Sequence, residues 1–156
     1  MIISNTAYID PVIKFNDEQV EIVECHKHLD VTFSSDGKWT NHINNIIESS
    51  MKQINALRKL TYILSSKNLS NISLTFIRHL LEYACQVWDG CCESEVERFE
   101  KVQLGAARIV LGLTKFASRE SLYFEIGWET LTERRKNRKL CIFYRMHNNI
   151  WPQYLS

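Results

Sequence analysis

The feature that most constrains this fold is a change in hydrophobic period near Trp39. From there to about residue 148, apolar residues recur mostly at spacings of three, four or seven, which is the pattern of amphipathic helices. The chain of 156 residues has only two prolines and five glycines, so few positions can break a helix. A mainly helical body the size of one domain is therefore predicted.

Five helices are predicted, over 40–64, 69–88, 94–111, from 118 or 121 to about 127, and over 130–148. Polar residues able to cap helix N-termini stand near three of these starts: Thr40 or Asn41, Ser118 or Ser121, and Thr130 or Thr132. Glycines stand where three helices should stop: Gly90, Gly112 and Gly127. In the last helix, one face carries Leu140, Phe143, Tyr144 and His147.

The first 35 residues have the composition of strands. Two strands over 8–15 and 19–24 are predicted around the turn Asn16-Asp17-Glu18, and a third over 28–34 before Ser35-Asp36-Gly37. The predicted fold class is α+β, mainly α, with a small N-terminal antiparallel β-sheet followed by the helical bundle. Residues 1–39 should pack on 40–156 as a single folded unit.

Composition excludes several classes of protein. With 45% apolar and 24% charged residues, the chain is an ordinary globular sequence, and no apolar run approaches membrane-spanning length. No secretory signal is visible, so we expect an intracellular protein of the cytoplasm or nucleus, with its five cysteines reduced. Neither Cys25-His26-Lys27-His28 nor Cys91-Cys92 has the spacing of a zinc site, so no metal site is predicted.

Catalytic motifs are also missing from the sequence. It has no nucleophile elbow, no glycine-rich phosphate loop and no Asp-Asp pair of the kind that positions two metal ions in polymerases. We therefore predict no catalytic residue, no small-molecule substrate and no cofactor for this chain alone.

Basic residues are the strongest physical signal. The densest cluster comprises Arg134, Arg135, Lys136, Arg138 and Lys139, and a weaker one comprises Arg58, Lys59 and Lys67. Such clusters contact phosphates through charge-assisted hydrogen bonds and counterion release. The alternative is a solvated helix turn whose aliphatic stems cover the edge of the core. Residues 1–39 hold three Lys against seven acids, so the net positive charge lies in the helical part.

Several dispersed motifs, in order, resemble reverse transcriptases of Jockey-type non-LTR retrotransposons. The resemblance covers roughly residues 8–156, and its motifs are 28–33, Asp36, Trp39, His42-Ile43, 57–60, 81–88, 99–112, Glu133-Arg134-Arg135 and 151–155. His28 stands where that family usually has Tyr, and Asp30 stands where it usually has Gly.

The resemblance implies a region that follows the catalytic palm, with a primer-grip-like segment at His28, Leu29, Asp30 and Val31 and thumb-side helices after it. The chain would then be a fragment of an RNA-directed DNA polymerase, beginning at an internal Met and inactive alone. Mg²⁺ is implied only for the missing palm. In the parent protein, the helices over 40–64 and 69–88 would flank the RNA or DNA template–primer, with Arg58 and Lys59 contacting its backbone.

Two other readings remain open from the sequence. The chain could be a helical protein-interaction module, or an inert relic of such an element, with no role in nucleic-acid binding. A complete polymerase of a new kind would require DNA synthesis by the purified chain with Mg²⁺.

Overall fold

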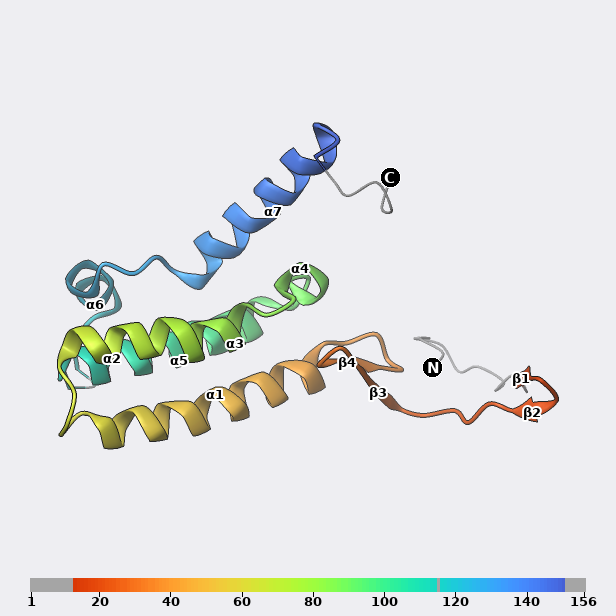
Figure 1. Ribbon diagram of the computed structural model, residues 1–156, viewed down its shortest axis with the longest axis horizontal. Helices are drawn as coiled ribbons and strands as arrows, with labels where there is room; N and C mark the ends of the chain where they lie inside the picture. Colours follow the sequence, from red (N-terminus) through yellow and green to blue (C-terminus); the bar gives the residue numbers. More distant parts are fainter. Residues whose placement is uncertain (1–12, 115, 151–156) are drawn as a thin grey trace. The chain divides into compact units, whose positions relative to one another are not determined.

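The computed structural model describes residues 13–114 and 116–150. Its fold is α+β and mainly helical, as predicted, but two separate antiparallel hairpins stand where one small sheet was expected (Figure 1). The chain separates into two compact units, residues 1–45 and 46–156, and the boundary falls inside helix α1 (Thr40–Leu60). The N-terminal unit thus contains both hairpins and the beginning of α1.

The first hairpin pairs β1 (Lys14–Phe15) with β2 (Glu18–Gln19). Its turn lies at the predicted place, with Asn16 and Asp17 at φ 50° and 65°. The predicted strand over 19–24 is wrong, because the strand on that side is only Glu18–Gln19. Of the predicted strand over 8–15, Lys14–Phe15 lies in the ladder among the described residues. Both strands are exposed, so among the described residues no packed layer extends the ladder. Residues 8–12 of the prediction lie outside the described part.

The predicted strand over 28–34 is instead the second half of a hairpin. Strand β3 (Cys25–His28) pairs with β4 (Val31–Ser34), and the turn between them is Leu29-Asp30, at φ 46° and 62°. Positive φ at both central residues is what a two-residue hairpin with a type I′ turn requires. Position 30 is where the resembling family has Gly, which adopts this conformation at no steric cost.

The start of α1 packs on β4 within the N-terminal unit. The Thr32 backbone N–H donates to His42 Nδ1 at 3.3 Å, and Asn45 Nδ2 donates to Thr32 Oγ1 at 3.3 Å. The Trp39 ring meets Phe33 edge-on at a centroid distance of 5.7 Å. Burial lowers the pKa of His42, so the imidazole accepts this hydrogen bond as a neutral ring.

The predicted second helix over 69–88 is broken into pieces. It consists of α2 (Ser66–Ile72), the π-helical segment η1 (Ser73–Ile77), α3 (Arg78–Glu82) and α4 (Cys85–Trp88). The break follows Glu82, where Tyr83 is extended and Ala84 is left-handed at φ 48°. The Trp88 indole N–H donates to the Tyr83 carbonyl at 2.9 Å, which satisfies the backbone at the break.

The last three predicted helices are confirmed: α5 (Glu93–Leu111), α6 (Arg119–Ile126) and α7 (Leu131–His147). Ser118 and Thr130 cap α6 and α7 by accepting from backbone N–H groups three residues ahead, as their chemistry predicted. Gly112 and Gly127 end α5 and α6 at φ 67° and 69°. Gly90 has no such conformation, and the left-handed residue near α4 is Ala84.

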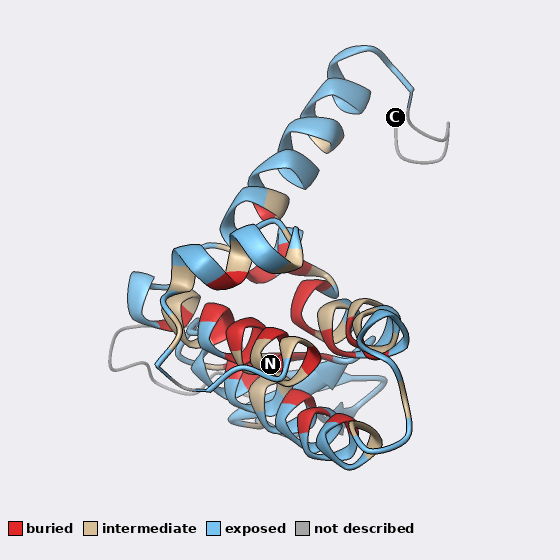
Figure 2. Cartoon of the chain, turned by 90° about the vertical axis from the view of Figure 1, so that its left-hand side faces the viewer, coloured by how far each residue is buried: buried red, intermediate tan, exposed pale blue. Residues whose placement is uncertain are grey.

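The core of the C-terminal unit takes one fully buried large side chain from each of five helices. These are Leu81 of α3, Trp88 of α4, Phe99 of α5, Leu122 of α6 and Leu131 of α7, each 0% exposed. Figure 2 shows buried residues gathered on the facing sides of these helices, whereas the C-terminal part of α7 is almost entirely exposed. Only the first half of α7 therefore contributes to this core.

Candidate nucleic-acid interface

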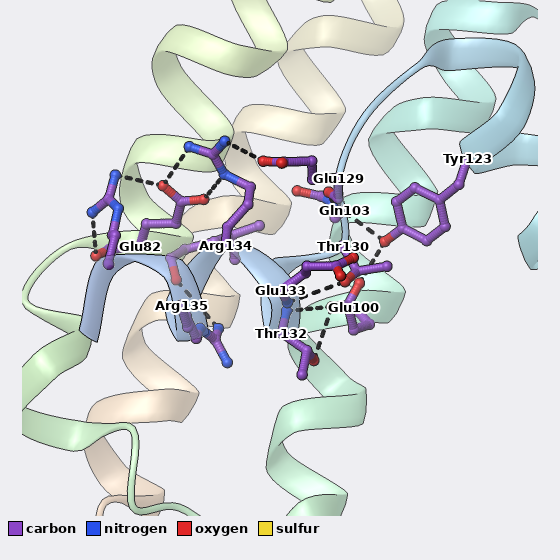
Figure 3. Close-up of polar contacts among 12 residues, drawn as sticks. Glu82, Glu100, Gln103, Tyr123, Glu129, Thr130, Thr132, Glu133, Arg134 and Arg135 are labelled. Atoms are coloured by element: carbon purple, nitrogen blue, oxygen red, sulfur yellow. Dashed lines mark hydrogen bonds and ion pairs between the residues drawn. The ribbon is translucent and has the colours of Figure 1, made fainter. Parts of the chain in front are cut away.

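Two arginines of the α7 cluster share one buried carboxylate. Glu82, at the end of α3, has a side chain only 2% exposed, and both Arg134 and Arg138 pair with it (Figure 3). Arg138 Nη2 lies 2.6 Å from Glu82 Oε2, and Arg134 donates through Nε and Nη2. Arg134 also reaches Glu129 at 3.1 Å. The hydrogen bond to Glu82 is the main cause that raises the pKa of Arg134.

Arg135 is a core residue. Its guanidinium carbon lies 4.7 Å from the centroid of the Trp88 ring and 4.5 Å from that of Phe99, and the residue is 2% exposed. Cation–π attraction of this kind stabilises a buried guanidinium. Burial nevertheless lowers the pKa of Arg135, because the charged form loses hydration there.

The two lysines of the cluster differ from each other. Lys139 forms an ion pair with Asp89, the residue that follows α4. Lys136 is exposed and takes part in no ion pair among the described residues. Four of the five clustered cations are thus engaged by acidic or aromatic side chains of the protein, although Arg138 and Lys139 stay 43% and 55% exposed, and Lys136 is the member without an ion-pair partner among the described residues.

The weaker predicted cluster is differently placed. Arg58 and Lys59 lie in the last turn of α1, and Lys67 lies in the first turn of α2. All three are exposed, and none forms an ion pair within the described residues. Between them stand Tyr62 and Ile63, 92% and 78% exposed. We call these five residues the α1–α2 corner.

Sequence reasoning missed Tyr62 and Ile63. The available signal was the tract between Glu48 and Glu82, which contains no acidic residue and includes an aromatic residue between basic ones. Two other cations of this tract are engaged: Lys52 pairs with Glu48 at 2.8 Å, and Arg78 lies over Trp128 at 5.0 Å. The corner therefore holds the cations of this tract that form no ion pair or cation–π contact within the part of the chain that the structure describes.

A buried polar network fixes the start of α7 (Figure 3). Glu100 of α5, 5% exposed, accepts from the Thr132 backbone N–H at 3.0 Å and from the Tyr123 hydroxyl. Gln103 Nε2 donates to the Tyr123 oxygen at 3.2 Å and to the Glu129 carbonyl at 2.9 Å. Burial, followed by the Glu100 hydrogen bond, raises the pKa of Tyr123, so its hydroxyl stays a donor. The network ties α5, α6 and α7 together.

The predicted primer-grip-like residues do not share one surface. Leu29 is 75% exposed at the tip of the β3–β4 turn, whereas Val31 is 5% exposed. Asp30 pairs with Lys27 at 2.7 Å, and this contact lowers the pKa of Asp30. His28 is exposed at the end of β3. The turn therefore presents Leu29 together with an ionised carboxylate whose negative charge is offset by Lys27.

The residues present do not fit a magnesium site. Within 13–114 and 116–150, no three His, Cys, Asp or Glu side chains lie together in a way that could hold a metal ion. All five cysteines are free thiols, and burial raises the pKa of Cys85 and Cys91. In the same part of the chain, none of the helices has the length and hydropathy to cross a membrane.

Comparison with known proteins supports the resemblance found in the motifs. Over 127 residues the chain is 23% identical to a probable RNA-directed DNA polymerase from transposon X-element of Drosophila melanogaster. The match covers 78% of this chain and 14% of that protein. No family model and no solved structure matches. The similarity confirms a relationship to retrotransposon reverse transcriptases, while the region of the polymerase to which the chain corresponds stays a prediction.

Proposed function

We propose that this chain corresponds to the primer-grip and thumb-side region of a non-LTR retrotransposon reverse transcriptase, and that it contacts the template–primer duplex without catalysing synthesis itself. The polymerase relationship supports the origin, and the chain spans only about one seventh of that relative. The observation that supports the binding role is the α1–α2 corner, where three exposed cations form no ion pair within the described residues and stand on either side of the exposed Tyr62 in the sequence.

The corner has the chemistry that a nucleic-acid backbone favours. Each cation that neutralises a phosphate releases a condensed counterion, so several together give affinity without sequence preference. Arg58, Lys59 and Lys67 have no competing protein carboxylate within the acid-free tract. Tyr62 adds a ring on which an unpaired base can stack.

The α7 cations contribute differently in this proposal. Arg134, Arg138 and Lys139 hold α7 against the ends of α3 and α4, and Arg135 fills the core between them. Lys136 is the member of the cluster with no ion-pair partner among the described residues, so it is the first that we expect to meet a phosphate. Arg135 would reach the duplex only by leaving the core, which costs several kcal/mol for a buried charge, whereas Arg138 and Lys139 are ion-paired but 43% and 55% exposed.

The β3–β4 turn is the proposed primer-grip-like element. Leu29 supplies an apolar tip at positive φ, and Lys27 offsets the negative charge of Asp30. A non-glycine residue in this conformation costs about 1–2 kcal/mol and persists where the surroundings enforce it.

Salt titration tests the proposal. The chain is titrated with an RNA–DNA hybrid at several salt concentrations, and the slope of log affinity against log salt is compared between two triple variants. Changing Arg58, Lys59 and Lys67 to glutamine should flatten the slope by about 2–3, because each phosphate contact contributes about 0.9 to that slope. The control changes the exposed Lys14, Lys38 and Lys101 to glutamine, which removes the same charge elsewhere.

Equal slopes for the two variants would mean that the corner is not the interface. Absence of salt-dependent binding by the wild-type chain would instead favour the protein-interaction module.

A further inference from the structure

Helix α7 has two contact faces, and within residues 13–114 and 116–150 only the inner one is buried. The inner face carries Leu131 and Arg135, 0% and 2% exposed. The opposite face carries the four residues predicted to lie together, Leu140, Phe143, Tyr144 and His147, and three of them are 56%, 68% and 62% exposed in that order. His147 is exposed as well. We call these four residues the outer face of α7.

The outer face is continuous and ordered. Its members follow the i, i+3, i+4, i+7 spacing of a helical contact stripe. The Phe143 and His147 rings stack at a centroid distance of 6.3 Å and an interplanar angle of 8°. Contiguous exposed apolar surface of this kind marks an interaction site, unlike single apolar residues scattered on a surface.

A depression lies beside this stripe. It has a volume of about 350 Å³ and is lined by Leu140, Cys141, Tyr144, Arg145 and Ile150. Ile150 reaches it because the chain turns back after α7, where the Ile150 N–H donates to the Arg145 carbonyl at 2.9 Å. The concavity offers a seat for a side chain of a docked helix, which a flat lipid surface would not require.

The charge around the outer face identifies its partner. After Glu133 the sequence contains no acidic residue. Lys136 precedes Leu140 by about one turn on the same side, Arg145 borders the depression, and neither forms an ion pair within the described residues. Two copies of α7 would bring these positive charges together in either orientation, so a second copy is disfavoured.

We propose that the outer face of α7 binds an amphipathic helix whose apolar stripe is flanked by Asp or Glu. The apolar stripe of that helix covers Phe143 and Tyr144 and places one side chain in the depression, while its carboxylates meet Lys136 and Arg145. This proposal does not depend on the α1–α2 corner, which lies on other helices, and Lys136 is the residue that it shares with the proposed nucleic-acid interface.

Fluorescence anisotropy with labelled helical peptides of about 18 residues, roughly five turns, tests the proposal on the full chain. The probe carries leucines at helical spacing with glutamate flanks, and its matched partner carries lysine flanks. We expect the glutamate peptide to bind and the lysine peptide to bind at least about tenfold more weakly. The double variant Leu140→Ser with Phe143→Ser should lose at least about tenfold in affinity for the glutamate peptide.

Phe124→Ser is the matched control, because Phe124 is 92% exposed on α6. It should leave peptide binding unchanged, and circular dichroism should show the same helix content for all variants. Several results would overturn the proposal: no binding of the glutamate peptide at about 1 mM, equal binding of both peptides, or an equal loss in the Phe124 variant. So would self-association, or binding to phosphatidylserine vesicles, that the double variant abolishes.

Discussion

The α7 cluster and the α1–α2 corner are both basic, yet the structure gives them opposite environments. The cluster has five cations in six residues, and four of them are held by Glu82, Asp89 or the rings of Trp88 and Phe99. The corner has fewer cations, and none is paired within the described residues. Charge density along the sequence is therefore a poor measure of charge that is available to a ligand.

The difference has a structural cause. The break at Tyr83 and Ala84 ends α3 and starts α4, so Glu82 and Asp89 both lie at helix ends that face α7. Arg58, Lys59 and Lys67 form no such ion pair within the described residues, and the sequence between Glu48 and Glu82 contains no acidic residue. Acids that are distant in the sequence thus pair with cations of the dense α7 cluster, whereas the sparser cations of the α1–α2 corner form no ion pair within the described residues.

The largest expected effect comes from substitution of Arg135. Without that effect, Arg135 would not be held in the core, and the contrast between the α7 cluster and the α1–α2 corner would fail. Arg135→Ala leaves a cavity between two aromatic rings and should lower the free energy of unfolding by about 3 kcal/mol. Arg135→Met keeps the volume and removes the buried charge, so it should cost less than about 1 kcal/mol or stabilise the chain. Urea unfolding of both variants measures this.

The same Arg135→Met variant also tests whether Arg135 is a core residue or a residue that contacts phosphate. Its affinity for an RNA–DNA hybrid should equal that of the wild type. A marked loss of hybrid binding by a stable Arg135→Met protein would show that this arginine contacts phosphate after all.

Glu82→Gln has the next largest expected effect. It should make the α7 cluster more like the α1–α2 corner, because fewer of its cations would be held by protein carboxylates. Losing the buried carboxylate releases Arg138 and leaves Arg134 paired with Glu129 alone, so the free energy of unfolding should fall by about 2 kcal/mol. The freed guanidinium group should steepen the salt dependence of hybrid binding by about 1. Thermal unfolding and the salt titration measure the two changes, and Glu120→Gln, an exposed acid on α6, serves as the control.

An unchanged salt slope in a destabilised Glu82→Gln protein would mean that α7 is turned away from the duplex. In that case Lys136 would also be removed from the proposed interface.

Ala84→Gly has the smallest expected effect. It tests the left-handed conformation of Ala84 at the break between α3 and α4. Ala84 is held at φ 48°, where glycine has no steric penalty, so the substitution should raise stability by about 1 kcal/mol. Hybrid binding should not change. The matched control is Ala107→Gly, within α5, which should destabilise by about 1 kcal/mol or more because Ala107 is helical and 0% exposed. Destabilisation by Ala84→Gly would show that the left-handed turn is not the native conformation.

Much of the fold was predictable because its signals are local. Hydrophobic spacing located the helices, Ser118 and Thr130 marked two starts, and Gly112 and Gly127 marked two ends, since capping depends on residues only a few positions apart. The turn at Asn16-Asp17 was found for the same reason. The break at Ala84 was missed, because alanine rarely adopts a positive φ. The local pattern also predicted a strand over 28–34 across the turn at Leu29-Asp30, which only the resemblance to the polymerase family indicated.

The sequence by itself determined the positions of most helices, the absence of an Asp-Asp pair and the relationship to retrotransposon polymerases. Only the tertiary structure decided which basic residues are free, because Arg134 and Glu82 are 52 positions apart. It also decided that the apolar stripe of Leu140, Phe143 and Tyr144 faces outward. Periodicity shows that residues share a helix face, whereas the elements packed around that helix determine which face is buried.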